Sequence, residues 1–199
     1  IHVSKVAQQV APLHQVNSLT RVVLHVGDGG IILFNDQRRF GRLEILDEVG
    51  LERVLVRFGP EPLEASFTPE VLRPLLKRRR ALKAILLDQQ SVAGIGNIYA
   101  DEILFHAGLG PRKLGSSLKA KDVDSLHEAI RDILMKAVKH RGTSFSDYRD
   151  GKGEKGDFER RLKVYGREGE PCRVCRSEIQ LTVCAGRSTR WCPRCQKGK

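Results

Sequence analysis

Two Cys-x-x-Cys pairs near the C-terminal end constrain the fold of this chain most. Cys172 and Cys175 form the first pair, Cys192 and Cys195 form the second, and 16 residues lie between the pairs. Four thiolates at this spacing are typical of a closed tetrahedral zinc site, which is structural rather than catalytic. Two disulfides are the less favoured alternative, because they would leave the fifth cysteine, Cys184, unpaired. The sequence therefore predicts one structural zinc ion held by the four paired cysteines, with Cys184 as a packed thiol.

The segment between the two cysteine pairs has the pattern of a β-hairpin. Residues 178–183 alternate in hydropathy with a period of two, residues 185–187 supply a turn, and residues 189–191 lead back. The tip of this hairpin would present two arginines and a serine to an anion such as a phosphate: Arg187, Ser188 and Arg190. For Arg190, the alternative is that its stem only lies beside Trp191.

Positive charge is concentrated at the C-terminal end. Residues 160–199 hold 11 Lys and Arg residues against 3 Asp and Glu residues, which is +8 of the net charge of +11. Such a basic pole is typical of a protein that binds a polyanion, although a solvated tail would have the same composition. Because a membrane-spanning helix needs about 20 consecutive apolar residues, the short apolar runs of this chain exclude a transmembrane protein, and no membrane partner is expected.

The middle of the chain is predicted to be helical. A helix is expected from Thr68 to Lys77, followed by the basic run 77–80 and by helices at 82–87, at 97–107 and from an Asp122 cap to Gly142. Between the second and third of these lies Gly94-x-Gly96-Asn97. Both glycines can adopt positive φ, and Asn97 would cap the helix and act as a donor. This turn is expected to direct backbone amides at a phosphate.

The first sixty residues are predicted to form β-structure. Residues 20–26 and 31–34 would pair across a glycine-rich turn, and residues 42–46 would add a strand. Next to them, Arg38, Arg39 and Phe40 lie in a turn. An aromatic ring between arginines can wedge into a duplex while the guanidinium groups bind phosphates or unpaired base edges. The alternative is a surface arginine pair beside a core phenylalanine.

Four segments together resemble the bacterial formamidopyrimidine-DNA glycosylase / endonuclease VIII family, and its formamidopyrimidine branch above all. They are residues 35–41 (NDQRRFG), 94–102 (GIGNIYADE), 164–172 (VYGREGEPC) and 192–196 (CPRCQ). The resemblance implies an α+β architecture in three parts. These are a partial β-sandwich at residues 1–60, a helix-two-turns-helix DNA-binding domain at 65–165 and a zinc finger at 166–199. It also implies base-excision repair of double-stranded DNA that is damaged or abasic.

The same resemblance implies roles for individual residues. Arg38 and Phe40, with Arg39 beside them, would fill the void and wedge the duplex opposite a flipped nucleotide. The phosphate-binding set would be Lys83, Asn97 and Arg187. Tyr165 would lie near the backbone of the damaged nucleotide, and residues 142–156 would be a mobile loop that closes over the extruded base.

Departures from the family pattern set the expected activity. The family begins its catalytic segment with Pro-Glu, in which the proline is the nucleophile, and this sequence contains no such segment. Ile1-His2 of this chain instead resembles a later strand of the family, and Lys5 stands where that strand has an intercalating methionine. We therefore expect a damaged-DNA binding protein without glycosylase activity. The alternative is an active glycosylase/AP lyase whose N-terminal segment is not shown, and a sequence-specific transcription factor is less favoured.

Assembly and location follow from the same reasoning. A partial sheet exposes edges, so either self-association or a partner chain that completes the sandwich is expected. A bacterial repair protein that binds chromosomal DNA is expected in the cytoplasm, at the nucleoid.

Overall fold

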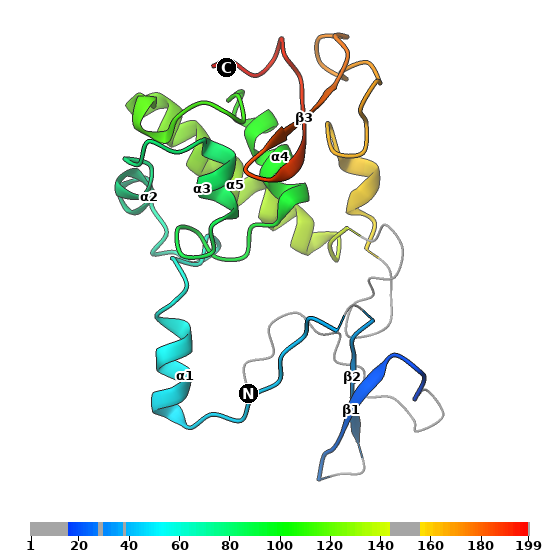
Figure 1. The fold of residues 1–199 in the computed structure, drawn as a ribbon. Coiled ribbons are helices and arrows are strands. Elements are labelled where there is room, and N and C mark those ends of the chain that lie inside the picture. The colour runs from blue at the N-terminus through cyan, green and yellow to red at the C-terminus, as the bar shows by residue number, and fades with distance from the viewer. Residues whose placement is uncertain (1–15, 28–29, 38, 144–155, 199) are drawn as a thin grey trace. The chain divides into compact units, whose positions relative to one another are not determined.

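The computed structural model describes residues 16–27, 30–37, 39–143 and 156–198 (Figure 1). The chain divides into two compact units, which we call unit 1 (Ile1–Leu46 and Lys139–Arg160) and unit 2 (Asp47–Val138 and Arg161–Lys199). The three predicted domains have other boundaries and stay a prediction. Among the described residues, no helix is both long and apolar enough to cross a membrane. Residues 1–15, including Lys5, and loop residues 144–155 lie outside the described part.

Unit 1 contains the predicted N-terminal hairpin. Strands β1 (Thr20–His25) and β2 (Ile31–Asn35) pair antiparallel, with Val23 opposite Leu33. Ile31 and Leu33 are buried and Val23 packs against them, so the hairpin has a small core of its own. The predicted strand at residues 42–46 is wrong, since this segment has no regular secondary structure and the side chain of Ile45 is fully exposed. A strand needs a neighbour for its backbone hydrogen bonds, and the described part of the sheet has only two members.

Helices form most of unit 2. They are α1 (Glu48–Leu55), α2 (Pro69–Leu75), α3 (Leu82–Leu87), α4 (Asn97–His106), the 3-10 turn η2 (Gly115–Ser117) and α5 (Ala120–Lys139), with a second 3-10 turn η3 (Phe158–Arg161) at the boundary with unit 1. Helix α5 buries one apolar stripe, including Leu126 and Ile130 at helical spacing, and this stripe forms a large share of the core.

Two helix starts differ from the predictions. Helix α5 begins at Ala120, so Asp122 is a first-turn residue rather than a cap, and its carboxylate binds Lys113 at 2.9 Å. Helix α1 was not predicted at all, although Asp47 caps it by accepting a hydrogen bond from the Gly50 amide at 2.7 Å. None of its residues is fully buried, and the segment lies within the first sixty residues, which were predicted to form β-structure.

The C-terminal hairpin is confirmed. Strands β3 (Gln180–Cys184) and β4 (Arg187–Trp191) pair antiparallel, and Ala185 and Gly186 adopt φ of 53° and 68° between them. Two consecutive positive φ angles are typical of the tight turn that suits the twist of a two-stranded ribbon. After the hairpin, the chain returns to the helices, where the Gln196 side chain donates to the Leu109 carbonyl at 2.9 Å. The hairpin is thereby attached to the helical part of unit 2.

Candidate nucleic-acid interface

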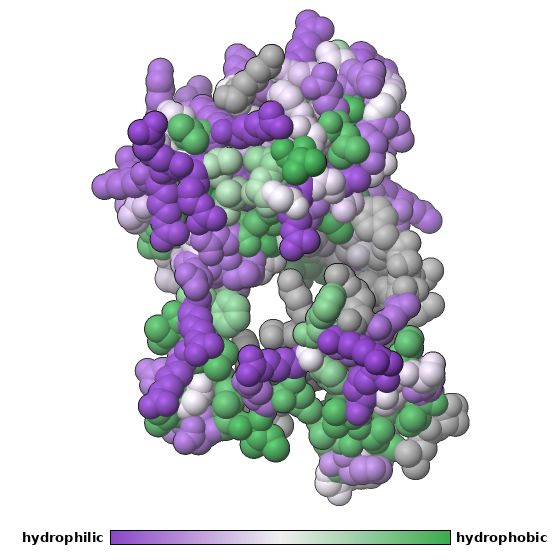
Figure 2. Space-filling model, in the orientation of Figure 1, coloured by the Kyte–Doolittle hydropathy of each residue, from purple (hydrophilic) through white to green (hydrophobic). Residues whose placement is uncertain are grey.

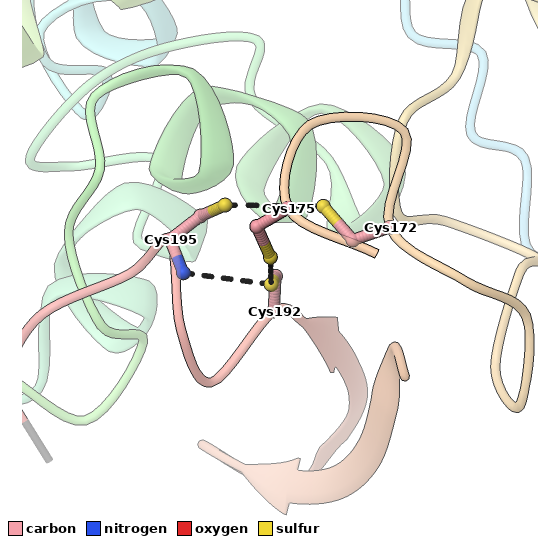
Figure 3. Close-up of side chains that lie close together, drawn as sticks. All are labelled: Cys172, Cys175, Cys192 and Cys195. Carbon is pink, nitrogen blue, oxygen red and sulfur yellow. Dashed lines mark hydrogen bonds between the residues drawn. The ribbon is translucent and has the colours of Figure 1, made fainter. Parts of the chain in front are cut away.

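The four paired cysteines converge on one point (Figure 3). Their sulfur atoms all lie within 4.8 Å of one another; Cys172 and Cys195 are 3.8 Å apart and Cys175 and Cys192 are 3.4 Å apart. A tetrahedral zinc ion with Zn–S bonds of about 2.3 Å places its sulfurs about 3.8 Å apart, so the cluster fits zinc. These residues form a structural zinc site.

Two backbone amides are directed at sulfur atoms of this cluster. The Val174 amide donates to the Cys172 sulfur at 3.4 Å, and the Cys195 amide donates to the Cys192 sulfur at 3.5 Å. Amide donors directed at sulfur stabilise its negative charge, as a zinc ligand requires. Cys184 stays outside this cluster as a buried thiol that donates to the Pro111 carbonyl at 3.6 Å, which agrees with its predicted role.

The glycine turn before α4 leaves the first amides of that helix without intrahelical acceptors. Gly94 has φ of 78°, a left-handed conformation that favours glycine, whereas Gly96 has φ of −100° and is the N-cap. The prediction that Asn97 caps the helix is therefore wrong, since Asn97 is its first residue. Gln89 fixes the turn, because its side chain accepts from the Gly94 amide at 2.8 Å and donates to the Ile95 carbonyl at 3.0 Å. The partly positive end of the α4 dipole lies here.

Asn97 brings this helix start next to the tip of the C-terminal hairpin. Its side-chain amide donates to the Ser188 carbonyl at 3.1 Å, while its own side-chain oxygen is buried without a hydrogen-bond partner in the described structure. Arg187, one residue before Ser188, is exposed. Two residues 90 positions apart, both predicted to bind phosphate, are thus on one side of unit 2.

Lys83 is not available to phosphate, and its predicted role in direct DNA contact is corrected here. Its side chain is fully buried, and its ammonium group lies 2.6 Å from an Asp101 oxygen, 2.9 Å from the Ser188 carbonyl and 2.8 Å from the Thr189 hydroxyl. An ammonium group has three protons, so these acceptors use all of them. Lys83 instead joins α3, α4 and β4.

Asp101 is the buried counter-ion of Lys83. Its second oxygen accepts from the Arg190 amide at 2.9 Å. Burial raises the pKa of Asp101 to about 6, even though Lys83 and the Arg190 amide favour its charged form. Burial also lowers the pKa of Lys83, against the attraction of Asp101. Such a pair keeps its charges only while both partners are present.

Glu102 attaches a second segment to α4. Its carboxylate accepts from three consecutive amides, those of Lys163 at 2.8 Å and of Val164 and Tyr165 at 2.9 Å each. Burial nonetheless raises the pKa of this carboxyl group. Sequence reasoning left the structural roles of Asp101 and Glu102 unassigned, although two adjacent acids within an otherwise apolar helix were a usable signal.

Arg190 is held within the protein rather than presented at the hairpin tip as expected. Its guanidinium group lies 4.6 Å from the centre of the Tyr165 ring and binds both carboxylate oxygens of Glu168, at 3.0 and 3.2 Å. A further bond of 3.0 Å reaches the Ser188 hydroxyl. Because only 14% of the Arg190 side chain is exposed, Arg187 is the hairpin-tip arginine that faces solvent. Arg190 in turn positions the ring of Tyr165.

The proposed wedge belongs to unit 1. Phe40 is 80% exposed, which rules out the alternative of a core phenylalanine. Arg39 before it adopts a left-handed φ of 57°, so the chain turns sharply there. Arg38 lies outside the described residues. The DNA contacts of these three residues stay a prediction.

Comparison with known proteins gives two family matches. Residues 58–149 match the formamidopyrimidine-DNA glycosylase H2TH domain, and residues 169–198 match the zinc finger found in FPG and IleRS. Among curated proteins, the formamidopyrimidine-DNA glycosylase of Desulfitobacterium hafniense is 49% identical over 180 residues, which is 89% of this chain and 66% of the relative. That of Desulforamulus reducens is 45% identical over 183 residues, with 90% of this chain and 66% of the relative covered. The chain thus spans slightly less than two thirds of the length of these relatives.

Solved structures give a similar result. The MutM (Fpg) protein from Thermus thermophilus is 42% identical with a TM-score of 0.83, and the match covers 96% of this chain and 71% of that one. A complex between the Lactococcus lactis Fpg and DNA that contains an abasic site is 35% identical with a TM-score of 0.83, covering 96% and 70%.

Proposed function

The chain belongs to the formamidopyrimidine-DNA glycosylase family, and on that premise we propose that its 199 residues bind duplex DNA at a damaged or abasic nucleotide. The observation that carries the proposal is the convergence of the α4 start with the hairpin tip. Asn97 contacts Ser188, and Arg187 next to it has no ion-pair partner among the described residues. The solved structure with an abasic site in its DNA is a relative of this chain, so the same ligand is the natural probe.

A phosphate at this point would meet two kinds of donor. The first amides of α4 lack intrahelical acceptors and point along the helix axis, and the Arg187 guanidinium adds a full positive charge with paired N–H groups. These contacts would position the DNA backbone without reading the base sequence. Discrimination of a damaged site is assigned to the exposed Phe40 with Arg38 and Arg39 in unit 1, and to Tyr165 in unit 2.

A gel-shift titration with an abasic duplex tests the proposal. Arg187→Ala should lower affinity about tenfold at 0.1 M salt and reduce the slope of log K against log salt by about 0.9, which is the effect of one lost phosphate contact. Arg194→Ala removes an equal charge from an exposed arginine of the same zinc finger and should change neither quantity. No binding by the unmodified chain, or equal losses in both variants, would refute the proposal.

Base excision is the second candidate function, favoured by the names of the curated relatives, which are formamidopyrimidine-DNA glycosylases. We propose binding without excision as the first candidate and excision as the second, and one assay separates them. Borohydride added to the protein and an abasic duplex traps any imine between the two. Retarded DNA without nicking supports binding alone, whereas a stoichiometric covalent adduct with strand cleavage establishes the lyase.

Location and assembly are proposed on the same basis. A protein with this ligand would act on chromosomal DNA in the bacterial cytoplasm. The two-stranded sheet described in unit 1 has open edges, so we propose that a second copy or a partner chain pairs with it. Gel filtration that returns a monomer with no added partner contradicts self-association.

A further inference from the structure

A run of four cations connects α2 to α3. Lys77, Arg78, Arg79 and Arg80 are all exposed. Figure 2 shows hydrophilic side chains gathered over the part of unit 2 that contains these two helices. We call residues 77–80 the basic run. Such a run is usually a solvated surface. Whether it is instead a binding surface depends on where its side chains are held.

Two members of the basic run are fastened to the turn between α3 and α4. The guanidinium of Arg80 lies 2.9 Å from an Asp88 oxygen, and that of Arg78 lies 3.6 Å from the same oxygen and 3.4 Å from the Ser91 hydroxyl. Asp88 directly follows α3, and the turn it opens ends at Asn97. The basic run is therefore held against the turn that bears the candidate phosphate site, rather than extending freely into solvent.

The charge of the basic run is not balanced locally. Asp88 is its one ion-pair partner among the described residues, and this carboxylate also accepts from the Gln90 amide at 3.1 Å and the Ser91 hydroxyl at 3.2 Å. Lys77 and Arg79 have no acidic partner in the described part of the chain. One carboxylate against four cations leaves a net charge of +3 at the edge of this turn.

We propose that the basic run is a second phosphate-binding surface, which contacts the DNA backbone on the duplex that flanks the site held by Asn97 and Arg187. The inference rests on the proposed DNA binding and extends it. Arg78 and Arg80 shape the surface through Asp88, and Lys77 and Arg79 supply the contacts. Phosphate is the partner that fits, because a run of exposed cations attracts the DNA backbone without reading the base sequence.

The test compares two double variants of the full chain. Lys77→Ala/Arg79→Ala removes the two unpaired cations and leaves the anchored arginines in place. Lys121→Ala/Lys136→Ala removes the same charge from exposed positions on α5. Binding of an abasic duplex of about 25 base pairs is measured from 0.05 to 0.3 M salt, with unfolding in urea as a check on the fold.

Loss of two phosphate contacts should reduce the slope of log K against log salt by about 1.8, which corresponds to about 60-fold weaker binding at 0.1 M salt. The α5 control should keep the unmodified slope. An unchanged slope in the basic-run variant, or the same reduction in the control, overturns the inference while leaving the proposed function intact. Failure of the unmodified chain to bind DNA would instead refute the proposed function.

Discussion

Replacing Lys83 by methionine separates an internal role for this residue from a role in DNA contact. Methionine keeps an unbranched side chain of similar length but removes the charge and three donors, whose acceptors lie at 2.6, 2.8 and 2.9 Å. The partner carboxylate of Asp101 is as fully buried as Lys83 itself and keeps only the Arg190 amide. Breaking such a pair from one side costs about 3–5 kcal/mol of unfolding free energy.

The cost of this substitution should depend on pH in a defined direction. Burial raises the pKa of Asp101 from 3.8 to about 6 in the folded protein, so folding takes up a proton between these two pH values, and the associated stability is lost as pH rises through about 6. Without Lys83, the pKa of Asp101 rises further, and the loss continues to higher pH. The destabilisation should therefore grow above pH 6, by up to about 1.4 kcal/mol per pH unit, and stay constant well below it.

Urea unfolding of the zinc-loaded protein at pH 5.5, 7 and 8 provides the measurement. A double variant, Lys83→Met/Asp101→Asn, leaves no buried charge and should cost less than the sum of the two single variants by about 2 kcal/mol. A cost below about 1 kcal/mol at pH 8 would refute the internal role of Lys83. Unchanged stability of Lys83→Met together with lost DNA binding would instead support direct contact between Lys83 and a DNA phosphate.

Three further substitutions test the rest of the interface. Cys172→Ser should release zinc and abolish DNA binding together, because metal binding and folding of the finger are one equilibrium. Cys184→Ser, the control, should preserve both zinc and DNA binding. DNA affinity that survives the loss of zinc would contradict this coupling. Glu102→Gln should cost about 2–3 kcal/mol and speed amide exchange at residues 163–165, because a neutral amide with a single acceptor oxygen replaces a carboxylate that serves three donors. Phe40→Ala should change stability by less than about 0.5 kcal/mol, since the ring is 80% exposed, yet weaken binding to an abasic duplex more than to an intact one. Equal weakening on both duplexes would exclude a wedge.

The zinc finger was predictable from the sequence because its geometry depends on local spacing. Two Cys-x-x-Cys turns and a glycine between alternating residues specify both the metal site and the hairpin, and each was confirmed. Lys83 was not predictable in the same way. The family resemblance implied a phosphate-binding cation, whereas its acceptor Thr189 lies 106 residues away. Only the fold shows that this lysine is enclosed.

The strand at residues 42–46 and helix α1 were misjudged for a related reason. Alternating apolar residues predict a strand only where a neighbour accepts its hydrogen bonds, and no described strand pairs with Leu43 or Ile45. Helix α1 was missed because the first sixty residues were predicted to form β-structure, although the Asp47 cap and the apolar Leu51 and Val54 at helical spacing were a usable signal. In neither segment do the apolar residues of the local pattern reach the core, because none of their side chains is buried.

Zinc alone cannot set the distance between Arg187 and Asn97. All four ligands lie in residues 172–195, so the metal fixes the finger internally and leaves its attachment to α4 to other contacts. Lys83 supplies the charged part of that attachment by joining Asp101 of α4 to Ser188 and Thr189 of the hairpin. Metal loss should therefore abolish finger folding and DNA binding together. Lys83→Met should retain zinc and still weaken DNA binding through a displaced Arg187, and full affinity in the zinc-loaded variant would show that the finger is held in place by other contacts.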